Sequence, residues 1–448
     1  MEQNQMLTGR PGKTLFFFAL PMIVGNLFQQ FYNMVDSIIV GRYLGAEALA
    51  AVGASYSFTN VFIMIAIGGG IGASVLTSQY LGAEDYEKMR TSAYTALISF
   101  LVISVCLAAF GTFFNPSLMR ALNTPEDVFG DAMLYLQIYF MGLPFLFMYN
   151  VLSATFNALG KSRIPLYFLI FSSVLNVVLD VWMVRGLGFG IAGVAIATVI
   201  AQGVSAVLSF FVLLKELGRY PKAENGEAKI FAPIMLLKGT CFAIPSIVQQ
   251  SIVSIGMLLV QSVVNGFGTF VMAGYAAGSR VESICIVPMI ATGNAAATFT
   301  AQNLGARQPE RVRQGLKSAF MMIAGFGAII CLSLNLFHNQ IISAFINPSS
   351  VQAFATGNAY LAFISWFFVM IGFKAATDGV LKGSGDVIVY TLANLANLYI
   401  RVAVAKNYAP LWGVQAVWYA VPIGWTVNFL LSFSWYMTGR WSRKRVVS

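Results

Sequence analysis

The sequence predicts an all-α polytopic membrane protein whose twelve transmembrane helices form two pseudo-symmetric six-helix bundles around a central cleft. The first reason is composition, since 58% of the 448 residues are hydrophobic and 10% are charged, whereas soluble chains carry about 25% charged residues. The second is a series of apolar runs, each long enough to cross a hydrocarbon core of about 30 Å. The third is an internal repeat, in which motifs of the first half recur in the second half.

The apolar runs define the helices in chain order. We expect transmembrane helices near residues 14–40, 50–80, 93–114, 130–158, 165–184, 191–214, 240–264, 270–300, 318–337, 352–380, 387–404 and 413–437. The start of the chain is polar and the run after it is a full span, so we expect no cleavable signal peptide.

Basic residues are distributed unevenly among the predicted connections. If both termini are cytoplasmic, most of the 27 Lys and Arg residues fall in cytoplasmic segments, as the positive-inside rule requires. Arg280 and Lys374 fall within predicted spans. The net charge of +10 is therefore an orientation signal of a multi-pass protein of the cell membrane. We expect neither a nucleic-acid partner nor an obligate protein partner.

The residues that metal centres and catalytic triads use are scarce. The four cysteines lie in apolar runs without metal-ligand spacing, and the single histidine, His338, lies beside a predicted loop. We therefore expect no catalytic residues, no cofactor and no enzymatic activity.

The internal repeat is clearest in two polar connections. The segment SQYLGAEDYEKMR begins at Ser78 and the segment AQNLGARQPERVR begins at Ala301, a displacement of 223 residues. Two pairs of glycines share this displacement: Gly160 with Gly383, and Gly190 with Gly413. A constant displacement over such a length indicates a duplicated six-helix unit.

The duplication sets the predicted domain organisation. The predicted domains are an N-terminal bundle (1–214), a cytoplasmic linker (215–238) and a C-terminal bundle (239–448). Each copy has an even number of spans, so both enter the membrane from the same side and are related by an axis along the membrane normal. Two similar bundles that face each other across a cleft suit alternating access.

The first predicted helix carries an acid, Asp36, inside its apolar run. Such a carboxylate costs about 2.5–3.5 kcal/mol on insertion scales. Its polar neighbours are Asn26, Gln29, Gln30, Asn33 and Ser37. Together with Asp36 they fall within an arc of about 120° on a helix, so we expect this stripe to face the bundle interior or water. The alternative is an inert, hydrogen-bonded buried carboxylate.

Three further helices of the first half carry polar residues at helical spacing. The candidates are Asn150, Ser153 and Asn157 on the fourth span, Asn176 and Asp180 on the fifth, and Thr198 and Gln202 on the sixth. Asp36 and Asp180 with neutral oxygens could coordinate Na⁺, or the two acids could share and release a proton. Asp180 could instead be a hydrated residue at a helix end, and Asn176 and Thr198 could be polar packing residues.

The second half has a different set of charged residues. Val260 stands opposite Asp36 in the repeat, so we expect the ion chemistry in the N-terminal bundle. Glu282 is a candidate for attracting a cationic substrate, or else a structural contact between the bundles. Lys374 and Asp378 are four residues apart, and we expect them to form a structural ion pair.

These features together resemble the multidrug and toxic compound extrusion (MATE) transporters, and most closely their prokaryotic DinF-like branch. The resemblance rests on the six-plus-six duplication, on YNMVDSIIVGRYLGAEALAAVG, on the repeated QxLGA…E(K/R)xR connections, and on NALGKSRIP and LKGSGD. It implies secondary active efflux, in which inward-moving Na⁺ or H⁺ is exchanged for drugs, dyes and other amphipathic organic cations. It also implies a cation- or proton-binding cluster of Asp36, Asn176, Asp180 and Thr198.

The second half departs from the pattern of some members of this family. Relatives that use acids in the seventh and tenth spans have no counterpart here, because the seventh span has no acid and Asp378 does not align with the tenth-span residue. A cation site in the C-terminal bundle is therefore not expected.

We thus expect an efflux antiporter whose partners are amphipathic small molecules and the lipid bilayer. One alternative is a lipid-linked oligosaccharide flippase of the same superfamily, which would need cationic residues to hold phosphates. A less favoured alternative is a membrane-embedded enzyme, such as an intramembrane protease with paired catalytic aspartates, but Asp36 and Asp180 lie in no protease motif.

Overall fold

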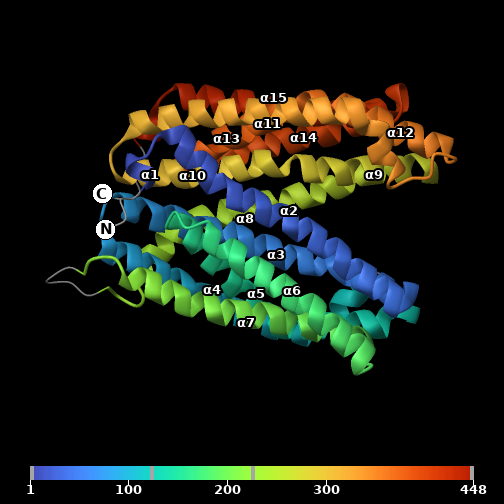
Figure 1. Cartoon of the computed structure of the whole chain (residues 1–448), viewed down its shortest axis with the longest axis horizontal. Coiled ribbons are helices and arrows are strands. Elements are labelled where there is room, and N and C mark those ends of the chain that lie inside the picture. Colours follow the sequence, from blue (N-terminus) through green and yellow to red (C-terminus); the bar gives the residue numbers. More distant parts are fainter. Residues whose placement is uncertain (1–4, 122–125, 223–227, 444–448) are drawn as a thin grey trace. The chain divides into compact units, whose positions relative to one another are not determined.

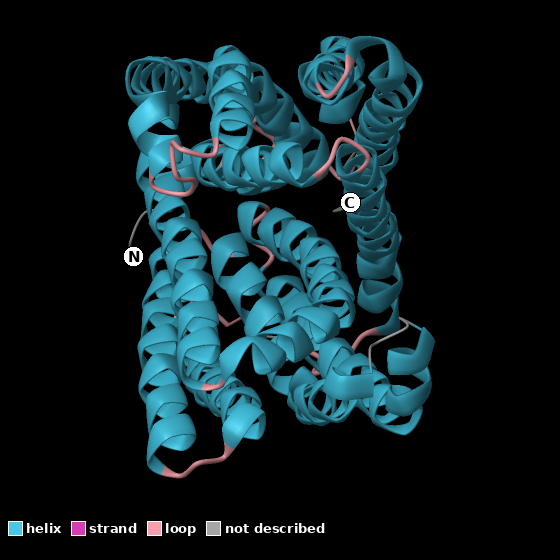
Figure 2. Ribbon diagram, turned by 90° about the vertical axis from the view of Figure 1, so that its right-hand side faces the viewer, coloured by secondary structure: helices cyan, strands magenta, loops and turns pink. Residues whose placement is uncertain are grey.

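The protein is all-helical in the computed structural model, which describes residues 5–121, 126–222 and 228–443. Within these residues, twelve segments are long and apolar enough to cross a membrane, which confirms the predicted polytopic class. Figure 2 shows helices joined by short loops, and no strand occurs in the described part of the chain. Residues 223–227 of the predicted linker lie outside the described residues, as do 1–4, 122–125 and 444–448 of the predicted bundles.

The helices have the following bounds in chain order: α1 (Gln5–Thr8), α2 (Pro11–Tyr43), α3 (Gly45–Gly82), α4 (Tyr86–Ala121), α5 (Glu126–Ala158), α6 (Arg163–Val181), η1 (Trp182–Gly186), α7 (Gly190–Gly218), α8 (Pro233–Asn265), α9 (Thr269–Cys285), α10 (Val287–Gly305), α11 (Pro309–Ser343), α12 (Val351–Ile364), η2 (Ser365–Phe367), α13 (Phe368–Ser384), α14 (Val387–Trp412), α15 (Gln415–Met437) and η3 (Arg440–Ser442). Every predicted span is present, and most are longer than the sequence predicted.

Two predicted spans are interrupted near their middles. The span predicted at 270–300 consists of α9 and α10, which break at Ile286 just before Pro288. Pro288 has no N–H to donate, so the hydrogen bond that would continue α9 through this point is missing, and proline is well tolerated in the first turn of the new helix. The span predicted at 352–380 consists of α12 and α13, joined by the short 3₁₀ turn η2.

The chain divides into two compact units. The N-terminal unit comprises residues 24–81 and 85–247, and the C-terminal unit comprises residues 1–23, 82–84 and 248–448. Helices α2 and α8 (Figure 1) each contribute their first part to one unit and the remainder to the other. The predicted bundles 1–214 and 239–448 follow the order of the repeat and stay a prediction.

The two helices that change unit each contain an internal proline. Pro21 lies in α2 and Pro245 lies in α8. In both helices the unit changes between the second and the third residue after the proline. An internal proline removes one backbone hydrogen bond and bends or loosens the helix, so each helix is weakened shortly before it passes from one unit to the other.

The repeat is visible in the backbone as well as in the sequence. Glu84 and Arg307, which are displaced by 223 residues, are the non-glycine residues with positive φ in the described chain, at 58° and 60°. The same displacement relates two pairs of glycines with positive φ: Gly45 with Gly268, and Gly190 with Gly413. Left-handed geometry is costly for residues with a Cβ, so its recurrence shows that the two halves share their turns.

One predicted glycine pairing differs in the structure. Gly160 has a φ of 78°, whereas its sequence partner Gly383 is helical, and Gly385 instead takes the left-handed conformation, with a φ of 85°. Gly383 serves another purpose, since a Cβ there would lie 2.2 Å from the carbonyl oxygen of Ala297 on α10. The glycine is needed for close helix packing and not for a turn.

The contact between α10 and α13 is unusually close along its length. A Cβ added to Gly379 would lie 2.2 Å from the Gly293 carbonyl oxygen, and one added to Gly293 would lie 2.5 Å from the Ala375 carbonyl oxygen. Small residues four apart on both helices allow the two backbones to approach. Helix α13 is thereby held firmly within the C-terminal unit.

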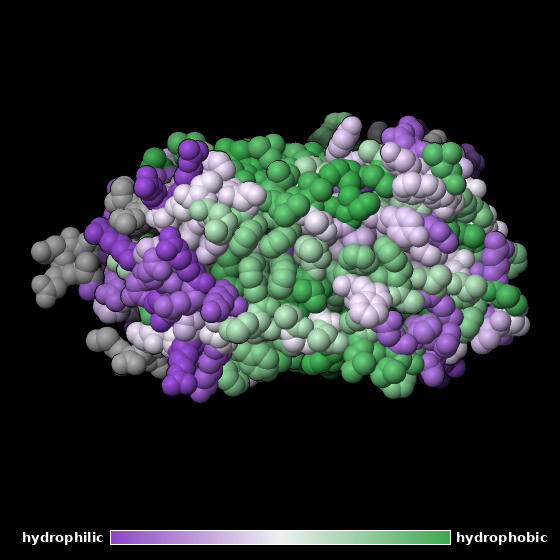
Figure 3. All heavy atoms as spheres, turned by 90° about the horizontal axis from the view of Figure 1, so that it is seen from above, coloured by the Kyte–Doolittle hydropathy of each residue, from purple (hydrophilic) through white to green (hydrophobic). Residues whose placement is uncertain are grey.

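The surface has the apolar character that a lipid environment requires. Figure 3 shows hydrophobic residues along the middle of the helices and hydrophilic residues toward the helix ends. Large apolar side chains are widely exposed, and examples are Val102, Phe113, Met321, Leu332 and Leu392. Soluble monomers rarely expose apolar patches of such extent, so these surfaces fit the hydrocarbon of a bilayer.

Candidate functional site

Helix α6 is polar where it is buried and apolar where it is exposed. Its fully buried residues are Ser173, Asn176 and Asp180. Val174 and Val178, on the other side of the same helix, are 55% and 59% exposed. This is the reverse of the pattern in a soluble protein, and it is expected of a membrane helix whose polar side faces other helices.

The two predicted acids of the N-terminal unit meet in the structure. Asp180 on α6 is completely buried, and Asp36 on α2 is half-buried. Their carboxyl groups lie within hydrogen-bond reach of each other. On each group the Oδ1 atom is buried and meets no hydrogen-bond donor among the described residues. We call Asp36 and Asp180 the acid pair.

The other two predicted members of the cluster adjoin the acid pair. The hydrogen-bond pattern favours the orientation in which Asn176 Nδ2 donates to Asp180 Oδ2 at 3.1 Å and Asn176 Oδ1 accepts from Thr198 Oγ1 at 3.2 Å. Thr198 Oγ1 also lies 3.0 Å from the carbonyl oxygen of Val194, one turn earlier on α7. Asn176 thus connects Asp180 on α6 to α7 through side-chain hydrogen bonds.

Two tyrosines that the sequence reasoning missed complete the surroundings. The Tyr32 hydroxyl lies 2.6 Å from the side-chain amide of Asn176. The Tyr135 side chain, on α5, lies close to both carboxyl groups of the acid pair. The four-residue spacing from Tyr32 to Asp36 was a usable signal, because such residues share a helix face. No sequence signal pointed to Tyr135, since its position depends on how α5 packs.

The remaining predicted residues of this unit do not hydrogen-bond to the acid pair within the described chain. Gln29 and Asn33 are exposed on α2. On α5, Asn150 donates to the Leu146 carbonyl oxygen of its own helix at 2.8 Å, and Ser153 lies within hydrogen-bond reach of Tyr149. Asn157 on α5 and Gln202 on α7 are half-buried.

The backbone beyond Asp180 has irregular geometry. Helix α6 ends at Val181 and continues as the π-helical turn η1. The Leu187 N–H donates to the Trp182 carbonyl oxygen at 3.0 Å across this turn. π-Helical turns are rare and frequently adjoin functional sites, and this one directly follows the buried acid.

Glu282, the predicted substrate residue of the C-terminal unit, lies among aromatic side chains. Its Oε2 atom accepts a hydrogen bond from the Tyr360 hydroxyl at 2.5 Å. The Tyr360 ring centroid lies 5.2 Å from that of Tyr275 and 5.8 Å from that of Trp418. Arg401 on α14 acts electrostatically on the same carboxylate. Glu282, Tyr275, Tyr360 and Trp418 are called the aromatic cluster below.

Polar atoms of this region lack partners within the described residues. They are the buried Nε atom of Arg401 and the buried Nε1 atom of Trp418. Arg401 was not noticed as a cation within a span, although it lies inside α14. The aromatic cluster therefore combines a carboxylate, ring faces and unsatisfied donors in one interior region.

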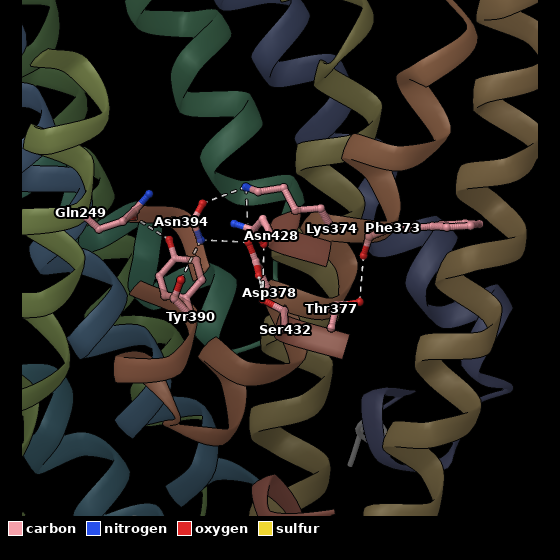
Figure 4. Close-up of polar contacts among 9 residues, drawn as sticks. All are labelled: Gln249, Phe373, Lys374, Thr377, Asp378, Tyr390, Asn394, Asn428 and Ser432. Atoms are coloured by element: carbon pink, nitrogen blue, oxygen red, sulfur yellow. Dashed lines mark hydrogen bonds and ion pairs between the residues drawn. The ribbon is translucent and has the colours of Figure 1, made fainter. Parts of the chain in front are cut away.

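Lys374 and Asp378 form the ion pair that the sequence predicted, with 3.3 Å between Nζ and Oδ2. Figure 4 shows that the pair belongs to a larger network that joins α13, α14 and α15. Asn394 Nδ2 donates to Asp378 Oδ2 at 3.0 Å, and Ser432 Oγ donates to Asp378 Oδ1 at 2.6 Å. This carboxylate is thus fully hydrogen-bonded, unlike the acid pair.

A family model described as MatE matches residues 21–182 and 245–406, which together make up more than half of the chain. The probable multidrug resistance protein YpnP of Bacillus subtilis is 28% identical over 453 residues, covering all of this chain and 99% of the relative. The FAD transporter of Shewanella oneidensis is 24% identical over 443 residues, covering 97% of this chain and 96% of the relative. A solved outward-facing multidrug resistance MATE family transporter of the MOP superfamily matches with a TM-score of 0.89 at 25% identity, covering 99% of both chains.

Proposed function

The chain belongs to the MatE family of multidrug efflux transporters, and from this premise we propose that it is a secondary active antiporter. It exports amphipathic, often cationic compounds in exchange for a proton or Na⁺ by alternating access. It resides in the cell membrane with both termini cytoplasmic, as the distribution of basic residues favours.

The contact within the acid pair is the observation that supports ion exchange. Two ionised carboxylates in contact present acceptor atoms and no hydrogen, and their like charges repel. A proton or a cation must therefore be taken up when Asp36 and Asp180 approach each other. The uptake favours one arrangement of the helices over another, and that difference in affinity couples ion movement to substrate movement.

The geometry favours a proton over Na⁺ as the exchanged ion. The two carboxyl groups lie within direct hydrogen-bond reach, and one shared proton is sufficient to join them. Asn176 and Tyr32 hold Asp180 in place through neutral hydrogen bonds, without adding charge.

The aromatic cluster is the proposed contact for the substrate in the C-terminal unit. A cation over an aromatic face gains about 0.5–2 kcal/mol, and the Glu282 carboxylate adds an opposite charge. The rings of Tyr275, Tyr360 and Trp418 are buried here, so the apolar part of an amphipathic compound would contact them only after the surrounding helices rearrange, as alternating access requires.

The coupling ion is tested with purified protein in liposomes. Efflux of a cationic dye is measured under a pH gradient without a Na⁺ gradient, and then under a Na⁺ gradient without a pH gradient. We expect transport under the pH gradient alone. Transport under the Na⁺ gradient alone would assign Na⁺ to the acid pair, and transport that ignores both gradients would favour a flippase and reject antiport.

The substrate contact is tested with Glu282→Gln. This variant keeps the side-chain size and removes the charge, so we expect the KM for a cationic dye to rise about tenfold, equivalent to 1.4 kcal/mol. The KM for a neutral dye is expected to change little. Equal effects on both dyes would contradict a role for the carboxylate in recognising positive charge.

A further inference from the structure

The network around Asp378 resembles an ion site that already contains its cation. Asp378 is 4% exposed, and its two oxygens contact Ser432, Asn394 and Lys374. The Lys374 ammonium also donates to Asn394 Oδ1 at 2.8 Å. The ammonium group of Lys374 thus contacts both a carboxylate oxygen of α13 and an amide oxygen of α14 (Figure 4).

The oxygens of this network are those that a small cation requires. Asp378 provides a carboxylate, Asn394 and Asn428 provide amide oxygens, and Ser432 provides a hydroxyl 3.4 Å from Asn428 Oδ1. Hard cations prefer carboxylate and neutral oxygen ligands. The lysine ammonium is itself a compact, strongly hydrated point charge, so it can take the place of a monovalent ion among such oxygens.

Within residues 5–121, 126–222 and 228–443, no second lysine forms an ion pair with Asp378. Lys382 lies on the same helix, but its Nζ atom lies over the Tyr390 ring, 5.2 Å from the centroid. Within the described residues it forms no ion pair with Asp378. Asp386, the other buried acid near this end of α13, accepts a hydrogen bond from Trp435. Lys374 is therefore the residue that forms the ion pair with the Asp378 carboxylate.

We propose that Lys374 is a tethered cation that fills a monovalent-cation site formed by Asp378, Asn394 and Ser432. The tether restricts ion exchange to the acid pair, because the C-terminal unit carries its own permanent positive charge. Removal of the ammonium leaves a buried carboxylate without a counter-ion, which is strongly unfavourable, and the vacated oxygens then bind Na⁺. The restriction of exchange to the acid pair rests on the proposed function, whereas the ion binding by Asp378, Asn394 and Ser432 does not.

The test is the effect of Na⁺ on thermal unfolding of the purified full-length protein. Lys374→Met keeps most of the side-chain length and removes the charge. NaCl is titrated against N-methylglucamine chloride at constant ionic strength, in the native chain and in the variant. Any response of the acid pair is common to both proteins, so the difference between them reports on the network around Asp378.

We expect the variant to show a saturable, Na⁺-specific rise in midpoint temperature on the order of 2 °C or more above that of the native chain. Adding Asp378→Asn to Lys374→Met should abolish this rise. Lys374→Arg, which keeps a cation, should not show it. Neither should Lys382→Met, which removes a half-buried lysine that forms no ion pair with Asp378 among the described residues.

A Lys374→Met response no greater than that of the native chain would overturn the proposal. If Lys374→Met aggregates, Lys374→Gln is purified in parallel in NaCl and in N-methylglucamine chloride. Recovery of folded protein in NaCl alone supports the proposal. Aggregation in both salts overturns it, because an available site would have taken up Na⁺ and restored the missing charge. Equal recovery in both salts is followed by the same Na⁺ titration.

Discussion

Both units of this protein bury a carboxylate between helices, but they compensate its charge differently. In the N-terminal unit the acid pair has two carboxyl groups in contact and, among the described residues, an Oδ1 atom on each that meets no donor. In the C-terminal unit Asp378 has hydrogen bonds on both oxygens and a lysine ammonium at 3.3 Å. Among the described residues, the first arrangement leaves one oxygen of each carboxyl group without a donor, and the second does not.

The comparison suggests why one unit is suited to exchange and the other to support. A site that takes up and releases an ion must be stable in two states of charge, which requires incomplete compensation by the protein. A buried carboxylate with its own counter-ion has one favourable state of charge, and removing either partner of the ion pair is costly. Close packing of α13 on α10 through Gly293 and Gly379 adds to that rigidity.

The largest expected effect is on transport, through the acid pair. Asp36→Asn and Asp180→Asn remove groups that can gain or lose charge, so we expect ion-driven dye efflux to fall to the rate of protein-free liposomes. Size-exclusion profiles in detergent should stay monodisperse, because asparagine has the shape of aspartate. Asp131→Asn, the same change at an exposed carboxyl group on α5, is the matched control. Full transport by either acid-pair variant would contradict the assignment of ion exchange to the N-terminal unit.

The next effect is on stability, through Asp378. Asp378→Asn leaves Lys374 buried without a counter-ion, with side-chain exposures of 16% for Lys374 and 6% for Asp378. We expect a loss of about 3–5 kcal/mol, measured by thermal unfolding in detergent. The double variant with Lys374→Met should recover much of that loss, since it removes both charges.

The control for that experiment is Glu310→Gln, which breaks the exposed pair with Arg313. Exposed pairs contribute about 0–1 kcal/mol, so this change should have little effect. A double variant as unstable as Asp378→Asn alone would mean that the ion pair is not what stabilises the network.

A smaller loss of stability is expected at the helix contact that holds α13. In Gly379→Ala the new Cβ would lie 2.2 Å from the Gly293 carbonyl oxygen, so the helices must separate. Such overpacking costs about 1–3 kcal/mol. Gly325→Ala on α11 should be neutral or stabilising, because among the described residues no atom outside the local helix backbone lies within 4 Å of the added Cβ. Equal melting of the two variants would contradict a rigid α10–α13 contact.

The smallest expected effect comes from Tyr32→Phe, beside the acid pair. This change removes one hydrogen bond to Asn176, worth about 0.5–1.5 kcal/mol. We expect the half-saturating concentration of the coupling ion to rise up to about tenfold, with the maximal rate nearly unchanged. Tyr167→Phe, at a tyrosine that is 63% exposed on α6, is the control. A larger rise in the half-saturating concentration for Tyr167→Phe than for Tyr32→Phe would show that Tyr32 does not contribute to the site.

The proximity of several members of the proposed ion-binding cluster was predictable because these residues recur at helical spacing along single helices. Asn176 and Asp180 are four residues apart, and such spacing places them on one face of a helix in any fold. Asp36 was predictable from its cost within an apolar run. The ion pair of Lys374 with Asp378 followed from the same four-residue spacing.

Other parts of the sites were not predictable from periodicity. Tyr135 reaches the acid pair from α5, and Ser432 reaches Asp378 from α15. Arg401 was overlooked although it lies inside α14. Which face of one helix meets which face of another depends on rotation and packing, and a single sequence does not specify either.

Hydropathy and helical spacing act along the chain, so the twelve spans, the duplication and the acids within spans could be predicted without coordinates. The tertiary structure decided that α2 and α8 each divide between two units. It also decided that the carboxyl group of Asp180 lies against that of Asp36, whereas the carboxylate of Asp378 contacts a lysine and side chains of α14 and α15. The physical reason is that charge compensation in a low-dielectric interior depends on distances between helices, and these are set only when the helices pack.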